Sequence, residues 1–479
     1  MKKFLILLIF NFSFLASFGN FLENTENIFI ENYETNEIAE KPVKAVIVQR
    51  MKVSNIDPAL MRDEYSKKIT PFVYDTLFTI DSNGKIENSL AEEYKWLSER
   101  ELYLKLKSKI LFHDNSELTA EDVKKSLNFL REQGTLKNLY SEITDIKVLS
   151  RNELVIKIAE EDNTFLNSLT YKISSIAKRE NKKVLGTGEY KIAAMTGKEI
   201  KLETFSNYKR EATQLKEIKF TWEMDEKQRI ISLFNDSADI ALDMEEGTIS
   251  EGKNLGILSK ENLIVPSRAL STTVILFGKE NDYSLETRNI LEKIMPRKAD
   301  TFFPKSLLKA QLSKIDTSHN KKEEKKLAEK LKNKELKLMI LNTESNMKYA
   351  QEIKSSLETA GIKVKILPHQ IESYNNKIAG KDFDIALFDI ITLNNDLIFS
   401  MSNILLNDVE NIELYNALQP FFKIVKDEKS KEKREAVIDK MAGLIHKNIP
   451  YIIIEHHKYF AVASPEFTEL LRNYEERLK

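Results

Sequence analysis

The chain has 479 residues, of which 42% are hydrophobic, 9% aromatic and 31% charged. This composition is typical of a folded globular protein and excludes a disordered one. Its 73 Lys and Arg residues balance 74 Asp and Glu residues, so the net charge is −1 and no overall field attracts nucleic acid or anionic lipid. We therefore expect no nucleic-acid partner.

The beginning of the chain has the pattern of an export signal. Two lysines precede an apolar run over residues 4–18, and small residues follow at a position suited to cleavage. The run is shorter than the ~20 apolar residues that span a bilayer, which argues against a permanent anchor. We expect a cleaved signal peptide at residues 1–19 and a polar, flexible leader at residues 20–42.

The sequence contains no cysteine. The roughly 460 residues after the signal are enough to bury a core without disulfides. The absence of cysteine also excludes a lipid-modified cysteine as an N-terminal anchor. An exported protein without that anchor is retained only where an outer membrane encloses the space, so we expect a periplasmic location.

The first half of the chain combines short strands with one well-marked helix. Residues 43–48 form a β-branched run, and residues 102–106 alternate leucine with polar side chains, as a half-buried strand does. Thr119 can cap the backbone N–H of Asp122, and the apolar residues that follow recur on one helical face. Further strands are expected at residues 154–158 and 217–222.

The second half changes to an alternation of strands and helices. A strand at residues 336–341 precedes a helix at 347–360, and Gly361 lies where a left-handed residue ends a helix. Strands at residues 362–367 and 384–388 follow. A strand, a crossover helix and a second strand predict a parallel pair in an α/β sheet.

Residues 112–123 resemble the signature of a protein family. They follow the pattern Phe-His-Asp-Gly-x-Pro-x-Thr-Ala-x-Asp-Val except at two positions, where Asn115 replaces the glycine and Glu117 the proline. The first replacement is mild, because Asn tolerates the left-handed backbone conformation. The block is similar to that of the family 5 extracellular solute-binding proteins, the peptide, nickel and opine class.

Further segments resemble the same family in order along the chain. Residues 75–84 are similar to its first hairpin and residues 90–98 to the segment after it. Residues 186–190 match its Gly-Thr-Gly-Pro-Tyr loop apart from Glu189, and residues 448–452 resemble its penultimate strand. The resemblance therefore covers nearly the whole chain after the leader.

The resemblance implies an α/β fold of two lobes joined by a hinge. This is a type II, cluster C-like periplasmic-binding-protein fold with an extra small domain inserted in the first lobe. We expect the hinge-proximal domain of lobe I at residues 43–65, 187–268 and 451–479, the inserted domain at 66–186, and lobe II at 269–450.

The resemblance also implies a function as the extracytoplasmic solute-binding component of an ABC import system. A ligand that contacts both lobes stabilises the closed form, which an ABC permease in the inner membrane would recognise. We expect a monomer whose ligand is a short peptide bound in the cleft between the lobes. Two alternatives stay open: an orphan cell-envelope binding protein that senses or scaffolds, and a binder of a metal complex, haem or an opine.

An enzyme is not expected from the motifs of this sequence. It has no Gly-x-Ser-x-Gly elbow, no His-Glu-x-x-His and no glycine-rich phosphate loop. We therefore predict no catalytic residues and no cofactor.

The expected ligand-binding segment departs from the family pattern. The family has a Trp and an Asp-x-x-Asp-Pro stretch, from which its peptide binders take the Asp that binds the ligand ammonium. Here the Trp is missing and Leu397 follows Asp396 in place of the proline. We hypothesise that Asp396 binds an ammonium group beside Asn394 and Asn395, the alternative being a solvated loop carboxylate. Trp222 is a further candidate for ligand contact, although core packing would also explain it.

The six histidines give no metal-binding pattern. His113 belongs to the signature block, where a structural hydrogen bond is expected. His456 and His457 are adjacent on a predicted strand and would point to opposite faces, so they cannot easily share one ion. We predict no metal site.

Overall fold

The structure is a computed structural model that describes most of the chain after the leader. The described residues are 43–61, 63–81, 85–135, 137–181, 183–208, 215–280, 283–301, 321–322, 325, 329, 331, 335–392, 412–428, 430–448 and 451–477. The predicted signal peptide (1–19) and leader (20–42) lie outside them. Within these ranges, none of the helices combines the length and the apolar character needed to cross a membrane.

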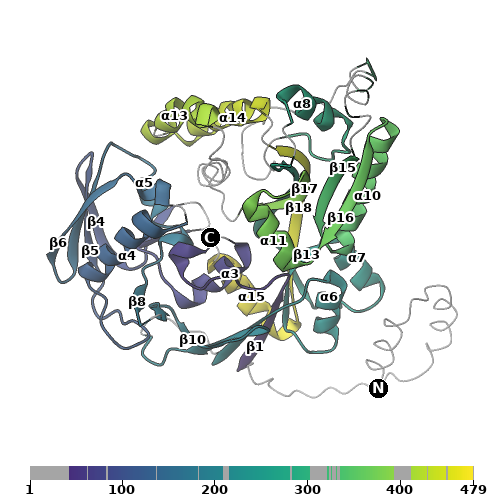
Figure 1. Ribbon diagram of the computed structural model, residues 1–479. Helices are drawn as coiled ribbons and strands as arrows, with labels where there is room; N and C mark the ends of the chain where they lie inside the picture. The colour runs from purple at the N-terminus through teal and green to yellow at the C-terminus, as the bar shows by residue number, and fades with distance from the viewer. Residues whose placement is uncertain are drawn as a thin grey trace, which may run out of the picture.

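One large sheet runs through both halves of the molecule (Figure 1). Its strands, in spatial order, are β10 (Tyr190–Met195), β11 (Glu199–Thr204), β12 (Glu217–Trp222), β1 (Lys44–Gln49), β13 (Ile240–Glu245), β18 (Tyr451–Ala463), β14 (Leu263–Phe277), β17 (Ile385–Thr392), β15 (Glu335–Leu341) and β16 (Lys363–His369). β1 lies parallel between β12 and β13, and β15 lies parallel between β16 and β17. The long antiparallel strands β14 and β18 connect these two parallel sets.

The local predictions are confirmed with small shifts at the ends. The strands predicted at residues 43–48 and 217–222 are β1 and β12, which pair in parallel. The predicted crossover helix is α10 (Glu344–Thr359), and it joins the parallel strands β15 and β16. Gly361 follows α10 with a φ of +87°, the conformation that its position after the helix predicts.

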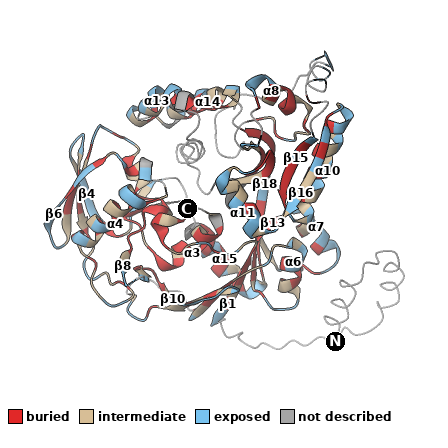
Figure 2. Ribbon diagram, in the orientation of Figure 1, coloured by how far each residue is buried: buried red, intermediate tan, exposed pale blue. Residues whose placement is uncertain are grey.

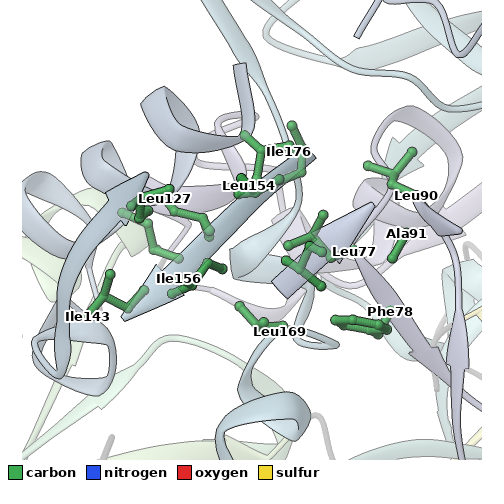
Figure 3. Packing of buried hydrophobic residues seen from close by; sticks show 14 of the residues in the cluster. Leu77, Phe78, Leu90, Ala91, Leu127, Ile143, Leu154, Ile156, Leu169 and Ile176 are labelled. Atoms are coloured by element: carbon green, nitrogen blue, oxygen red, sulfur yellow. The ribbon is translucent and has the colours of Figure 1, made fainter. Parts of the chain in front are cut away.

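A smaller four-stranded sheet forms the second unit of the first lobe. Its strands, in order, are β4 (Ala91–Ser98), β5 (Glu101–Leu106), β7 (Glu153–Ile158) and β6 (Ile143–Ser150). The leucines of β5 are fully buried, as their alternation predicts, and they pack with helix α4 (Ala120–Gln133) in the first core. Figure 3 shows this core, in which Leu127 of α4 lies near Ile143, Leu154 and Ile156 of the sheet.

The signature block connects this core to the rest of the lobe. Asn115 has a φ of +69°, which explains why the family pattern has glycine there. Thr119 and Asp122 form a reciprocal capping box at the start of α4, as predicted. The backbone N–H of His113 donates to the carbonyl oxygen of Gly186 at 3.0 Å. A Cβ at residue 186 would lie 1.9 Å from the backbone oxygen of Val73, so only glycine permits the close approach of these two segments.

Separate cores lie on each part of the large sheet (Figure 2). In the second core, β1, β12 and β13 pack against α3 (Glu64–Val73) and α15 (Thr468–Arg477). In the other lobe, Ile275 of β14 faces α8 (Leu285–Ile294) and α10, whereas Val274 faces α13 (Ile412–Asp427) and α14 (Lys431–Asn448). Consecutive strand residues thus serve the two faces of the sheet.

The membership of the cores suggests where the domain boundary lies, although the division into domains stays a prediction. α3 contributes Ile69, Phe72 and Val73 to the second core, beside β1. The residues of the first core from Leu77 to Ile176 pack among themselves and with Ala59. We therefore propose that the inserted domain begins after α3 rather than at residue 66.

The first testable prediction concerns the pH dependence of stability. His113 Nε2–H donates to the carbonyl oxygen of Gly188 at 3.0 Å, and burial lowers the pKa of His113 below 6.5 although this hydrogen bond opposes the shift. The native state then binds fewer protons than the unfolded state. His113 therefore contributes stability above the unfolded pKa, and this contribution is lost as the pH falls through the lower folded value.

Urea unfolding of the wild type and of His113→Gln at about pH 7.5 and about pH 5 measures this contribution. The wild type should lose more stability than the variant between the two pH values. An equal loss in both proteins would contradict the assignment.

Candidate functional site at the junction of the lobes

The carboxyl ends of parallel strands from both lobes meet near the middle of the large sheet. β1, β12 and β13 end there from the first lobe, and β17 runs there from the second. Crevices outside the carboxyl ends of parallel strands are where open α/β sheets bind ligands. We call the side chains at this place, Arg50, Asp243, Asp389, His457 and Tyr459, the interlobe junction.

An ion pair between Arg50 and Asp389 spans the two lobes. Arg50 directly follows β1, and its Nη1 lies 3.5 Å from Oδ2 of Asp389 in β17. The same nitrogen donates to the Tyr459 hydroxyl at 3.3 Å. The Arg50 side chain is only 13% exposed. Burial alone would lower the pKa of Arg50, but the neighbouring tyrosines and carboxylates raise it above its ordinary value, so the guanidinium stays charged.

Hydrogen bonds fix the position of Asp389. The Thr273 hydroxyl donates to Oδ1 of Asp389 at 2.6 Å. Because its hydrogen is used there, Thr273 accepts from His457, whose Nε2 lies at 2.7 Å. The His457 ring in turn stacks on Tyr459, with ring centroids 5.9 Å apart and an interplanar angle of 5°. The Asp389 carboxylate is therefore held by β14 and β18 and faces Arg50.

Asp243 forms the buried support of the junction. It has a φ of +60° and lies in a register irregularity of β13 opposite β18. Its Oδ1 is paired with Lys68 of α3, and its Oδ2 accepts the backbone N–H of Arg50 at 3.1 Å. Burial alone would raise the pKa of Asp243, but Lys68 and Arg229 lower it below its ordinary value. The carboxylate is thus ionised and anchors both α3 and the end of β1.

The lobes also touch at a second place, which we call the rim contact. Asn163 of the inserted domain donates its backbone N–H to the carbonyl oxygen of Lys426 at 3.0 Å, and its side-chain amide donates to the same oxygen at 3.1 Å. Lys426 forms an ion pair with Glu142, and Lys423 pairs with Glu160 at 2.9 Å. The final carbonyl groups of α13, which lack partners within a helix, are thus satisfied by the other lobe.

Of the predicted ligand-binding residues, the structure describes only Trp222. Asp396, Asn394 and Asn395 lie outside the described residues. Trp222 is the last residue of β12, beside Gln49 in the parallel register, and it is half-buried against the second core. Its contact with a ligand stays a prediction.

Sequence reasoning considered His457 only as a possible metal ligand and did not single out the other four junction residues. A partial signal was present, because Arg50 and Asp389 each place a charge just after a run of buried strand residues. No periodicity in one sequence connects two positions so far apart.

The histidines near the junction have hydrogen-bond partners on both sides. His456 Nε2 donates to the carbonyl oxygen of Thr301 at 2.9 Å, so its Nδ1 accepts from the Thr272 hydroxyl at 2.9 Å. Burial lowers the pKa of His456 and favours this neutral form. In the described ranges, no group of three or more His, Asp or Glu side chains is placed to hold a metal ion.

A hollow of about 540 Å³ lies on the surface beside α11 (Ile371–Gly380). It is lined by Gln370, Glu372, Ser373, Asn376, Lys377 and Asp382. Two of its charged groups, Lys377 and Asp382, are paired with each other at 2.9 Å. The hollow shares no residue with the interlobe junction, which therefore remains the candidate site.

Comparison with known families gives the class of this protein. Residues 85–411 match the bacterial extracellular solute-binding proteins, family 5 Middle. The match covers more than half of the chain, so the chain belongs to this family, as its signature block predicts.

Two curated relatives are similar over part of the chain. The nickel-binding protein NikA of Staphylococcus aureus is 25% identical over 249 residues, which are 48% of this chain and 50% of NikA. The glutathione-binding protein GsiB of Pectobacterium atrosepticum is 29% identical over 178 residues, which are 34% of this chain and 35% of GsiB. The chain thus spans about half or less of the length of these relatives.

Solved structures show the same fold at low sequence identity. The periplasmic binding protein DppA of Helicobacter pylori, in complex with the peptide STSA, has a TM-score of 0.77 and 17% identity over 89% of this chain and 94% of DppA. NikA of Staphylococcus aureus, in complex with Ni(L-His)2, has a TM-score of 0.74 and 19% identity over 89% of this chain and 95% of NikA. The predicted two-lobed periplasmic-binding-protein fold is confirmed.

The second testable prediction concerns Asp243. The substitution Asp243→Asn keeps a residue that tolerates the left-handed backbone but removes the negative charge that pairs with buried Lys68. Breaking a buried ion pair in this way should lower the free energy of unfolding by about 3–5 kcal/mol. Urea unfolding monitored by circular dichroism measures this loss.

Asp236→Asn is the matched control, because Asp236 has a similar φ of +59° but is exposed. Its effect should stay within about 0.5 kcal/mol. An equal loss of unfolding free energy in the two variants would contradict the stabilising role of the buried ion pair.

The third testable prediction concerns the rim contact. Lys426→Met removes the cation that pairs with Glu142, so the ratio of closed to open molecules should fall by up to about fivefold. Small-angle X-ray scattering would then give a larger radius of gyration than for the wild type.

Two further variants complete this test. The exchange of charges, Glu142→Lys with Lys426→Glu, should restore the wild-type value. Lys433→Met on α14, where the lysine is 73% exposed, should leave the radius unchanged. Equal radii for Lys426→Met and the wild type would contradict a role of the rim contact in closure.

Proposed function

We propose that this protein captures a small solute, a short peptide in the first instance, in the cleft between its two lobes and delivers it to an ABC permease. The interlobe junction supports this proposal most directly. Charged groups from both lobes lie within one ion-pair distance there, at the ends of parallel strands where such sheets bind ligands.

Binding would act through closure of the lobes. A solute that contacts both lobes binds the closed form more tightly than the open one and therefore shifts the equilibrium toward it. β18 is the strand about which the lobes would turn, because register irregularities flank it in both neighbours. β14 has one between Pro266 and Leu270, and β13 has one between Ala241 and Met244. No chemical step is needed for this function.

A short peptide is the first candidate ligand. DppA, whose structure contains a bound peptide, is similar in fold over most of the chain. In such complexes, backbone hydrogen bonds and a carboxylate for the ligand ammonium group give affinity. We propose that Asp396 supplies this carboxylate beside Asn394 and Asn395, and that Trp222 contacts the ligand from β12.

A nickel complex is the second candidate. NikA of Staphylococcus aureus is named as a nickel-binding protein, and its structure contains nickel bound by histidine. Such a complex brings its own metal ligands, so the protein would need only groups that recognise the complex. Haem and opines stay further alternatives.

The location and partners follow from the same proposal. We propose a monomer in the periplasm, exported by residues 1–19, that docks on a permease of the inner membrane. An orphan binding protein that senses or scaffolds is the alternative, and the gene neighbourhood distinguishes the two. Adjacent permease and ATPase genes would favour import.

Mass spectrometry of ligand released from the freshly purified protein tests the proposed function directly. A short peptide or a mixture of peptides is the expected result. Release of a nickel complex, haem or an opine would overturn the peptide assignment while keeping the solute-binding role.

The fourth testable prediction concerns Asp396. The substitution Asp396→Asn removes the charge proposed to bind the peptide ammonium, so affinity for trialanine measured by isothermal titration calorimetry should fall about tenfold or more. Asp145→Asn, at an exposed position of β6, is the control and should bind like the wild type. Unchanged affinity in Asp396→Asn would reject this role.

A further inference from the structure

We propose that Arg50 recognises a carboxylate group of the bound solute, while Asp389 and Tyr459 position its guanidinium. The inference deepens the proposed function, because it names the chemical group that the interlobe junction would select. The supporting observation is that two neighbouring arginines, Arg229 and Arg50, differ in how many hydrogen bonds their guanidinium groups make.

Arg229 shows what a structural arginine looks like in this protein. Four of the five N–H groups of its guanidinium donate to backbone carbonyl groups around the ends of β12 and β13. The four hydrogen bonds run to Leu242 at 3.2 Å, Glu223 at 2.8 Å, Met224 at 3.0 Å and Asp243 at 2.7 Å. All three nitrogens donate, so Arg229 has no edge left for a ligand.

Arg50 is somewhat less enclosed than Arg229 and makes far fewer hydrogen bonds. Nη1 donates to Tyr459 at 3.3 Å and lies 3.5 Å from Asp389. Both distances exceed the roughly 2.7–2.9 Å of a charge-assisted hydrogen bond. Among the described residues, none accepts a hydrogen bond from Nε or Nη2 of Arg50. The side of the guanidinium formed by these two nitrogens is therefore available.

The carboxylates near Arg50 stabilise its charge but use most of their hydrogen-bond acceptors for other groups. Asp243 is close, but its Oδ1 is paired with Lys68 and its Oδ2 accepts the backbone N–H of Arg50 rather than the side chain. Among the described residues, Asp389 is the other carboxylate that acts on Arg50, and its Oδ1 accepts a hydrogen bond from Thr273. An incoming anion would thus find a buried cation that is held in place but not fully paired.

The free edge matches one ligand chemistry. Two parallel N–H groups on one side of a planar guanidinium bind the two oxygens of a carboxylate together. A peptide carries such a group at its C-terminus, and an amino acid that chelates a metal carries one as well. Arg50 lies in one lobe and Asp389 in the other. A carboxylate bound here would therefore lie at the contact between the two lobes and could affect their closure.

The alternative is that Arg50 only joins the lobes. In that case its removal would weaken every solute alike, whatever its terminal group. Recognition of a carboxylate instead predicts that Arg50 matters for an acid and not for the matching amide. The test therefore compares acid and amide in the wild type and in Arg50 variants.

The fifth testable prediction is measured by isothermal titration calorimetry with two pairs of probes. The pairs are trialanine with trialanine amide, and L-histidine with L-histidinamide, the second pair in the presence of nickel chloride. The wild type should bind the acid of at least one pair about tenfold or more tightly than the amide. Arg50→Gln should reduce this preference to within about twofold by weakening the acid alone.

Control variants keep the test decisive. Arg50→Lys keeps a cation beside Asp389 but lacks the planar edge, so it should fold and lose most of the preference. It replaces Arg50→Gln if that variant does not fold by circular dichroism. Lys298→Gln removes a cation that lies over the ring of Tyr349, a neighbour of His457, and that is paired with Glu455 at 3.0 Å, so it should keep the full preference.

The outcomes separate this inference from the proposed function. Binding of acid and amide with equal affinity, or a full preference retained in both Arg50 variants, would overturn the role of Arg50 while leaving solute capture intact. Binding of the histidine pair alone would overturn the peptide assignment. The role of Arg50 would then be tested by comparing the affinities of L-histidine and L-histidinamide in the wild type and the Arg50 variants. Binding of no probe would overturn both the proposed function and the inference.

Discussion

The buried carboxylate of Asp243 is the constraint on which the junction of the lobes depends. Its left-handed backbone interrupts β13 beside β18, and its two oxygens hold Lys68 of α3 and the backbone at Arg50. Such a charge is stable inside a protein only when it is paired, so α3, β1 and β13 are fixed relative to one another. Arg50 is thereby presented to the second lobe from a rigid support.

That support contrasts with the limited contact between the lobes themselves. Among the described residues, they meet through β14 and β18, the Arg50–Asp389 pair, the rim contact around Lys426, and an apolar cluster in which Met51 and Met224 pack against the second lobe. The main cores of the two lobes pack on separate parts of the sheet, so turning about β18 would mainly disturb the small apolar cluster around Met51 and Met224. Polar contacts of this kind contribute little individually, which suits an equilibrium that a small solute must shift.

Membership of the family defines the class of this protein but not its ligand. Similar folds hold a peptide in DppA and a nickel complex in NikA, at 17% and 19% identity over the structurally aligned residues. The fold alone therefore does not decide the ligand, and we propose that side chains at the junction do. A carboxylate is common to peptides and to amino-acid complexes of metals, which is why Arg50 would suit either ligand class.

The sequence by itself determined what depends on neighbouring residues. It predicted the capped helix from Thr119, the left-handed Asn115 and the parallel pair around α10, because capping, backbone conformation and periodicity are local properties. Only the tertiary structure decided which charges meet. Lys68 and Asp243 are 175 positions apart, and no local pattern in one sequence connects them. The same holds for Arg50 and Asp389, whose meeting depends on how two lobes pack on one sheet.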